Sequence, residues 1–175
     1  YCSPLFNPVA DAIALDGLYR AWNNLPRVLD DPDNLDCRGE MMMASTQGAL
    51  AFQKGLGLIH SLSHPLGALT GKQLHHGTLN AVFMPHVIRF NADACAHKIN
   101  GMAHAMGVSE NGEAVAAAFF EMNQKAGLPL TLREMGVTEE DLDGIAEAAM
   151  DDHSTPTNPR PLSLEDCTEV LRAAF

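Results

Sequence analysis

Apolar and polar residues follow each other along most of this chain with the spacing of helices rather than of strands. Long stretches are rich in Ala, Leu and Met, which favour helices, and no alternating β-branched run has the length of a strand. Segment 7–26 opens with Asn-Pro, a typical helix start, and its residues Val9, Ile13 and Trp22 predict one buried stripe. The pattern predicts an all-α fold, a bundle of about seven to nine helices.

Residues that favour helix ends divide the chain into its expected helices. Asp33 is expected to cap a helix that covers residues 34–52, and Thr138 to cap one that ends near Met150. Ser163 opens a last helix, whose first turn carries the acidic residues that the helix dipole favours. Between these last two helices, three prolines in residues 153–161 predict a structured loop rather than a flexible linker.

Composition narrows the class of protein. With 175 residues, 46 % of them apolar, the chain is long enough for one domain with a real core. Its formal charge of -11 argues against nucleic acid and anionic membrane surfaces as partners, and no apolar run is long enough to span a membrane. Four widely spaced cysteines indicate reduced thiols and a cytoplasmic protein. Because the chain opens with Tyr1 and no signal-peptide pattern, we expect it to be a fragment of a longer protein.

Histidine is concentrated in one part of the chain. Five of the eight histidines fall between residues 60 and 86, namely His60, His64, His75, His76 and His86. His60 and His64 lie one helical turn apart, close enough to share a metal or a ligand. Pro65 requires the helix to kink or end close to His64, and Gly77 leaves room for a group to approach beside His76.

Two or three imidazoles suit Zn²⁺, Fe²⁺, Cu²⁺ or Ni²⁺, and no cysteine lies nearby. No Asp or Glu occurs between Glu40 and Asp93, so a carboxylate ligand would have to come from elsewhere. On the residues alone, His60 and His64 would both be ligands. The alternative, a solvated surface pair, stays open at this point.

The other conspicuous residues are expected to be structural. His86 is predicted to hydrogen-bond within the bundle, whereas His97 and His104 are predicted to be solvated. Large side chains on helices pack in cores, and small polar ones in loops face water. The predicted core residues are Phe52 and the run Met41–Met43, and the predicted solvated ones are Ser154 and the acidic clusters Asp30–Asp31, Glu139–Asp141 and Asp151–Asp152.

Several segments together resemble a known family. The runs 55–67, 75–81 and 84–91, with their ordered Gly, Pro and His positions, resemble the iron-containing alcohol dehydrogenases, also called metal-dependent or group III alcohol dehydrogenases. Residues 3–12 resemble the start of the helical region of that family, and residues 157–161 resemble the loop before its last helix. The resemblance covers essentially the whole chain.

The resemblance implies that residues 1–175 are the C-terminal all-helical, metal-binding domain, and that an N-terminal α/β domain outside this chain binds NAD or NADP. In the family, an Asp and three His hold the metal between the domains. Two of those histidines match His60 and His76; the other two ligands form an Asp-x-x-x-His pair upstream of Tyr1. His64 matches a histidine beside the metal and nicotinamide and is the predicted catalytic residue. A swap of ligand role between His75 and His76 is an alternative.

The implied function is the interconversion of an alcohol and an aldehyde or ketone by the parent enzyme, with Fe²⁺ or Zn²⁺ as the metal. The implied partners are the small-molecule substrate, the N-terminal domain of the same protein, and further copies in a homo-oligomer. Related alternatives are a metal-dependent polyol or glycerol dehydrogenase and an enzyme like maleylacetate reductase. As an isolated chain it would be a non-catalytic helical module, since it contains no phosphate-binding glycine loop.

Overall fold

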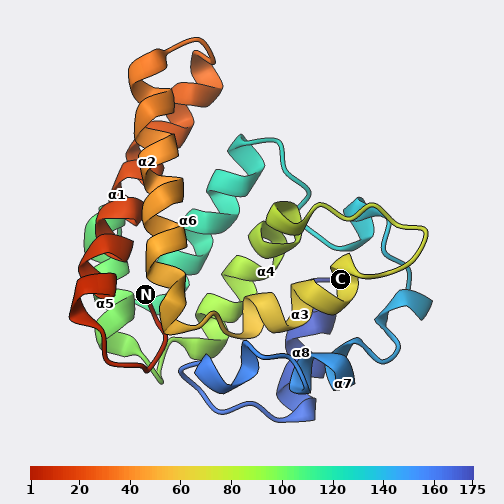
Figure 1. Ribbon diagram of the computed structural model, residues 1–175. Coiled ribbons are helices and arrows are strands. Elements are labelled where there is room, and N and C mark those ends of the chain that lie inside the picture. Colours follow the sequence, from red (N-terminus) through yellow and green to blue (C-terminus); the bar gives the residue numbers. More distant parts are fainter.

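A computed structural model describes residues 1–175 as eight α-helices without a β-strand, which confirms the predicted all-α class (Figure 1). The helices are α1 (Pro8–Asp30), α2 (Leu35–Ala51), α3 (Leu58–Gly67), α4 (His76–Asn91), α5 (Ala96–Met106), α6 (Gly112–Lys125), α7 (Ile145–Met150) and α8 (Leu164–Ala173). Short 3₁₀ turns cover Phe52–Lys54, Arg133–Met135, Glu140–Leu142 and Thr155–Thr157.

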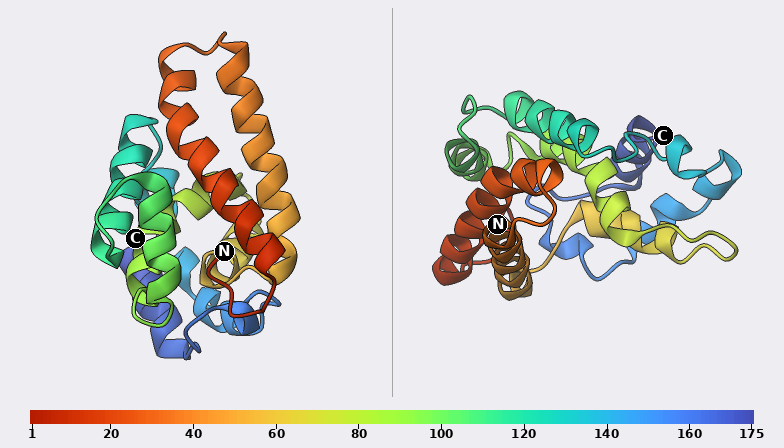
Figure 2. Two further views of the ribbon diagram at one scale, coloured as in Figure 1. Left: turned by 90° about the vertical axis from the view of Figure 1, so that its left-hand side faces the viewer. Right: turned by 90° about the horizontal axis from the view of Figure 1, so that it is seen from above.

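The helices form a body and a projecting hairpin. Helices α1 and α2 pack against each other over most of their length, and their connecting end extends beyond the rest of the molecule (Figures 1 and 2). Helix α4 lies at the centre of the body, where it contacts α3, α6 and α8. The helices that carry the clustered histidines therefore lie inside the fold, not on the projecting hairpin.

Two apolar clusters hold the body together. The larger joins α3, α4, α7 and α8 and contains the fully buried Leu58, Leu62, Leu79 and Phe83. The smaller joins α5 and α6 to the end of α4, around residues such as Ile99. All four cysteines are free, as predicted, and none of the helices combines the length and apolar character required to cross a bilayer.

Helix α1 differs from the prediction at its end and on its buried face. It continues through Pro26 to Asp30, because a proline removes a single helical hydrogen bond that packing on α2 can offset. Its buried residues are Ala10, Gly17 and Asn24, whereas Val9 is exposed. Small residues face α2 here, so the predicted stripe of large apolar residues was wrong at Val9.

Two further helix boundaries were predicted wrongly. Helix α2 is capped by Asn34, whose side chain accepts the Cys37 N–H at 3.0 Å, and not by Asp33. The single helix predicted after Thr138 is a 3₁₀ turn followed by α7. Gly144 separates the two with a φ of 75°, a left-handed conformation that no α-helix contains.

The projecting hairpin also explains two wrong core predictions. Met42 is 73 % exposed, and Met43 and Phe52 are also exposed. Apart from the 3₁₀ turn that follows it, helix α2 packs mainly against α1, so apolar residues on its other faces remain in contact with solvent within this chain (Figure 1). Apolar residues of α2 therefore lie on a surface that no other part of this chain covers.

Candidate metal and catalytic site

Three of the clustered histidines meet where α3 and α4 lie side by side. His60 and His64 are one turn apart on α3, and His76 is the first residue of α4. The three ring centroids form a near-equilateral triangle, with 5.2 Å between His60 and His76 and 5.5 Å from His64 to each of them. The fold thus brings together the three histidines that the sequence singled out as metal-binding or catalytic.

Asn80, one turn after His76 on α4, lies between two of these rings. Its amide nitrogen Nδ2 is 3.1 Å from Nε2 of His76 and 3.4 Å from Nε2 of His60. Both imidazoles therefore present a bare Nε2 to one small volume, the arrangement that a cation bound by two imidazoles requires. The Oδ1 atom of Asn80 is buried and has no hydrogen-bond partner. Sequence reasoning missed Asn80, although its spacing of four residues from His76 on one helix was a usable signal.

His75 is turned away from this volume. It is the N-cap of α4, where its Nδ1 accepts the Thr78 N–H at 3.3 Å, and its ring lies against Gly77. A Cβ at Gly77 would be 3.1 Å from the His75 ring, so the group that approaches this glycine is His75 itself. Because capping occupies His75, His76 is the histidine that faces His60.

The start of α3 depends on a close approach between two loops. Gly55 and Gly57 have φ values of 93° and 130° with extended ψ, a region open essentially to glycine alone. A Cβ on Gly55 would overlap the Thr157 side chain, and the Leu58 N–H donates to Oδ1 of Asn158 at 3.2 Å. These contacts fix the direction in which α3 presents His60. The helix ends at Gly67, three residues after His64, so Pro65 does not terminate it at once.

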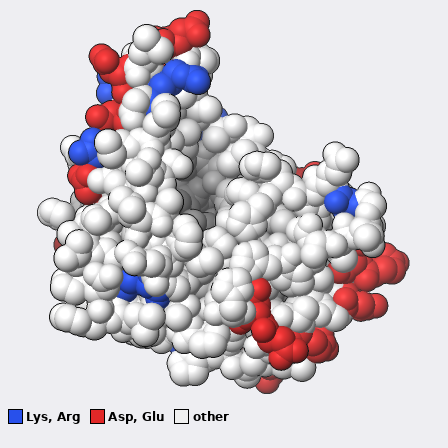
Figure 3. Space-filling model, in the orientation of Figure 1, with Lys and Arg blue, Asp and Glu red and all other residues white.

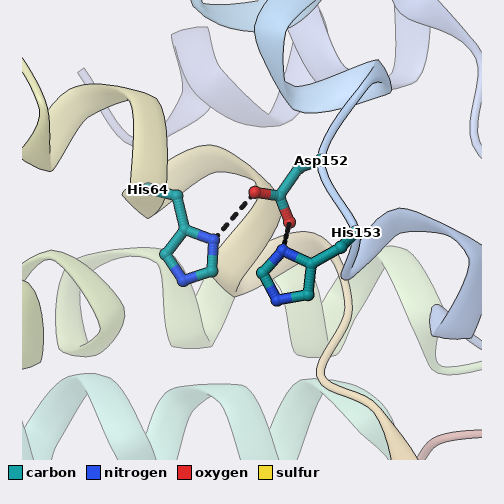
Figure 4. Close-up of side chains that lie close together, drawn as sticks. All are labelled: His64, Asp152 and His153. Carbon is teal, nitrogen blue, oxygen red and sulfur yellow. Dashed lines mark hydrogen bonds and ion pairs between the residues drawn. The ribbon is translucent and has the colours of Figure 1, made fainter.

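A fourth histidine extends the cluster. The His64 ring stacks between those of His76 and His153, inclined by 14° to each, with centroid distances of 5.5 Å and 5.3 Å. We call these three rings the imidazole row. Asp152, next to His153 in the loop after α7, lies 2.8 Å from Nδ1 of His64 through Oδ2 (Figure 4). Asp152 was predicted to be solvated, and this contact from a distant loop left no local signal in the sequence.

The electrostatics of the site follow from burial and from these contacts. Burial, together with the neighbouring His76 and His64, lowers the pKa of His60 to about 4. A ring that stays neutral near pH 7 keeps one nitrogen lone pair for a ligand. Partial burial raises the pKa of Asp152, but hydrogen bonds from the Ser154 N–H and from His64 outweigh it, and the net shift is downward.

An apolar cavity of about 430 Å³ reaches this site. Its walls come mainly from α1, α2, α4 and the start of α3, and include Phe52, Met84 and Phe119, with His60 at one end. No Lys, Arg, Asp or Glu lines it, and Figure 3 shows the uncharged hollow between the hairpin and the body. The cavity has the size and apolar character of small-molecule sites.

The remaining histidines lie apart from the site, as does one serine that was predicted wrongly. His86 follows His76 by ten residues on α4, about 15 Å along the helix axis, and is half-buried. His97 and His104 are exposed, as predicted. Ser154, predicted to be solvated, is 1 % exposed because its loop folds under α3, and its hydroxyl has no hydrogen-bond partner.

Comparison with known proteins gives a consistent result. A sequence profile described as "Fe-containing alcohol dehydrogenase family, C-terminal" matches residues 1–175. The 4-hydroxybutyrate dehydrogenase of Cupriavidus necator is 48 % identical in a match that covers 100 % of this chain and 47 % of the relative. The lactaldehyde reductase of Escherichia coli K12 is 38 % identical, with coverage of 80 % and 38 %.

The fold agrees with these matches. The crystal structure of a 1,3-propanediol oxidoreductase superposes with a TM-score of 0.94 at 33 % identity, again over 100 % of this chain and 47 % of that one. The chain therefore spans about half the length of the relatives that it matches. With a profile match along its entire length and a relative at 48 % identity, this chain belongs to the Fe-containing alcohol dehydrogenase family and corresponds to its C-terminal part.

Proposed function

We propose that residues 1–175 are the metal-binding, helical half of an oxidoreductase that interconverts a small alcohol and its carbonyl product. The observation that carries the proposal is the convergence of Nε2 of His60 and Nε2 of His76 on one point, with His64 beside them. Family membership and the named relatives, all dehydrogenases or reductases, support it.

The residues present fit a divalent metal. Two bare imidazole nitrogens face one donor, the Asn80 amide, which a cation would replace as their partner. Imidazole suits both iron and zinc, and a catalytic site of this kind takes further ligands, which the rest of the protein would supply. We assign His60 and His76 as the ligands contributed by this chain, and leave His75 as the helix cap.

In the proposed reaction, the metal, the nicotinamide cofactor and the residues of this chain would each have a separate role. A divalent metal supplies a Lewis acid for the substrate oxygen, and NAD or NADP, held mainly by the other half of the protein, supplies the hydride acceptor. We propose that His64 accepts the proton that the hydroxyl loses on oxidation and returns it on reduction. The uncharged cavity beside His60 excludes water and accommodates the carbon chain of the substrate.

The substrate class that we propose is a short primary alcohol with a second oxygen-bearing group. This proposal rests on the similarity to enzymes named for 4-hydroxybutyrate, lactaldehyde and 1,3-propanediol. A second candidate is a reductase of the maleylacetate type, because a structure of such an enzyme from Rhizobium superposes with a TM-score of 0.84 at 26 % identity. Turnover of maleylacetate without bound metal would favour that candidate.

The test uses the full-length protein. We expect one divalent metal per chain, identified as iron or zinc by elemental analysis, and NAD- or NADP-linked turnover of at least one of 4-hydroxybutyrate, 1,2-propanediol and 1,3-propanediol. Replacing His60 by Ala should abolish metal binding and turnover together, whereas His64→Ala should slow turnover and leave the metal bound. A His60→Ala protein that kept its metal and its rate would exclude this assignment.

Assembly is a further part of the proposal. Large apolar side chains such as Phe6 and Leu35 are 94 % and 79 % exposed within this chain. We propose that the NAD(P)-binding half and further copies in a homo-oligomer cover them. Sedimentation of the full-length protein as a monomer would contradict the oligomer.

A further inference from the structure

Asp152 lies between two rings of the imidazole row. Its Oδ2 atom is 2.8 Å from Nδ1 of His64, and its Oδ1 atom is 3.7 Å from Nδ1 of His153 (Figure 4). Both rings turn their Nδ1 edge to the carboxylate and their Nε2 edge away from it. The Asp152 side chain is 12 % exposed and that of His64 is 31 % exposed, so their contact is partly shielded from water, whereas His153 is 78 % exposed.

The loop holds the carboxylate of Asp152 in place independently of His64. The Ser154 N–H donates to Oδ1 at 2.8 Å, which closes a turn of the kind that Asp side chains favour. The backbone of Asp152 is held on both sides, since its N–H donates to Ala149 and its carbonyl oxygen accepts the Thr155 N–H. Hydrogen bonds other than the one to His64 therefore hold the carboxylate in place, as the role of a positioning group requires.

The chemistry of this contact determines which nitrogen of His64 carries hydrogen. An ionised carboxylate has no hydrogen to donate, so a hydrogen bond to it at 2.8 Å requires an N–H on Nδ1 of His64. In the neutral ring, the lone pair is then left on Nε2. The His64 ring centroid is 5.5 Å from those of His60 and His76, so the free nitrogen belongs to the ring beside the proposed metal ligands.

We propose that Asp152 is a positioning residue for His64: it accepts the Nδ1–H bond, fixes the ring orientation, and keeps Nε2 as the proton acceptor for the substrate hydroxyl. The inference rests on the proposed function, because it presumes that His64 exchanges the substrate proton. It deepens that function by adding a residue that neither touches substrate nor binds metal.

The same three side chains could be taken for a metal site of their own, because ligand atoms of His64, Asp152 and His153 lie within 4.8 Å of one another. A hydrogen bond accounts for the 2.8 Å contact between His64 and Asp152, and the third side chain, His153, is 78 % exposed. We therefore assign the contact to positioning and make metal content one of the measurements that can overturn this assignment.

The first experiment compares Asp152→Asn with Asp151→Asn in the full-length enzyme. The two variants make the same change of charge at adjacent positions, but Asp151 is exposed and touches no histidine of the row. We expect Asp152→Asn to lower kcat by about 10–100-fold, with KM changed by less than about threefold and the metal retained. Asp151→Asn should stay within about twofold of the parent. Loss of metal from Asp152→Asn, or an unchanged kcat, would overturn the inference.

The second experiment separates positioning from a structural role of the loop. If Asp152 acts only through His64, then adding Asp152→Asn to a His64→Ala enzyme should change the residual kcat by less than about twofold. A loop damaged by the substitution would lower the rate of the His64→Ala enzyme as well. An undiminished effect in that background would therefore refute positioning.

The third measurement needs no turnover. With ¹⁵N-labelled histidine in the full-length protein, we expect the His64 signals to show hydrogen on Nδ1 in the parent and a mixture of tautomers, or the reverse one, in Asp152→Asn. Identical spectra in the two proteins would contradict the inference even if the enzyme were active. Failure of the proposed function would look different: the parent would then lack metal and NAD(P)-linked turnover.

Discussion

The buried side-chain amides of Asn91 and Asn158 exchange two hydrogen bonds, at 2.8 Å and 2.9 Å, between the end of α4 and the loop before α8. Asn158 also accepts the Leu58 N–H at the start of α3 and donates to the Arg160 carbonyl oxygen. One side chain therefore joins the loop that follows Asp152 to the two helices that carry His60, His64 and His76.

Replacing Asn158 by Ala should destabilise the protein clearly, because it leaves the Leu58 N–H and the Asn91 amide buried without partners. Each unsatisfied buried group costs about 1–3 kcal/mol. The measurement is the urea midpoint of unfolding, with Asn100→Ala as control, since Asn100 is exposed on α5. Equal midpoints for the two variants would show that the Asn158 bonds contribute nothing net.

Gly55 and Gly71 should respond differently to alanine, although both have positive φ, 93° and 83°. At Gly71 nothing lies within 4 Å of a new Cβ, so only backbone strain of about 1–2 kcal/mol is expected. At Gly55 the Cβ would overlap Thr157, and the clash adds about 1–3 kcal/mol more. Unfolding free energies of the two variants test this, and a Gly71→Ala loss as large as that of Gly55→Ala would contradict it.

Alanine variants of the two adjacent histidines at the start of α4 should affect different properties: metal binding for one and helix capping for the other. His76→Ala in the full-length protein should lose the metal, because its Nε2 is one of the two that converge. His75→Ala should keep the metal and lose only a cap, a loss of about 0.5–2 kcal/mol. Elemental analysis and thermal unfolding of both variants distinguish the roles, and the reverse pattern would make His75 the ligand.

Asp11 on α1 should be important for stability because it neutralises a buried lysine. The Lys54 side chain is 2 % exposed and pairs with Asp11, which also pairs with Lys98. Asp11→Asn would leave a buried ammonium without a counter-charge, at a cost of about 3–5 kcal/mol. Asp16→Asn, on the same helix but in an exposed pair with Arg20, should cost much less, because exposed ion pairs contribute little to stability. Similar unfolding midpoints for the two variants would disprove the difference.

Acid should remove one specific contribution to stability. The hydrogen bond with Lys72, helped by the Thr138 N–H, lowers the pKa of Asp141 to about 2. A carboxyl whose pKa is lowered by folding stabilises the protein above its ordinary pKa, near 3.8, and this contribution disappears as the pH falls toward 2. The stability difference between the parent and Asp141→Asn should therefore shrink from pH 5 to pH 3, and a difference that stayed constant over this range would contradict the prediction.

Local signals in the sequence predicted the helices well and their ends less well. The predicted helix starts at Asn7 and Ser163 are both present, because each depends on neighbours in sequence. Other wrong predictions, at Val9, Met42, Phe52 and Ser154, concern burial, which depends on what packs over a residue from elsewhere in the fold. Periodicity cannot show that a hairpin projects from its body.

The site was predictable to the same extent. The spacing of His60 and His64 and the resemblance to a known family identified three histidines that the fold brings together. Asp152 and His153 reach the imidazole row from the loop after α7. His64 and Asp152 are 88 positions apart, and no local sequence pattern predicts their contact. The catalytic roles of these residues remain predictions for the experiments above.

The close approach of Gly55 and Gly57 to Thr157 and Asn158 has a consequence for exchanging parts between relatives. The two loops fit each other atom by atom, although about 100 residues separate them. A chimera that takes the first loop from one homologue and the second from another would mismatch them and tilt α3. Chimeras within the family should therefore fold well when both loops come from the same parent. The two loops should be exchanged together or not at all.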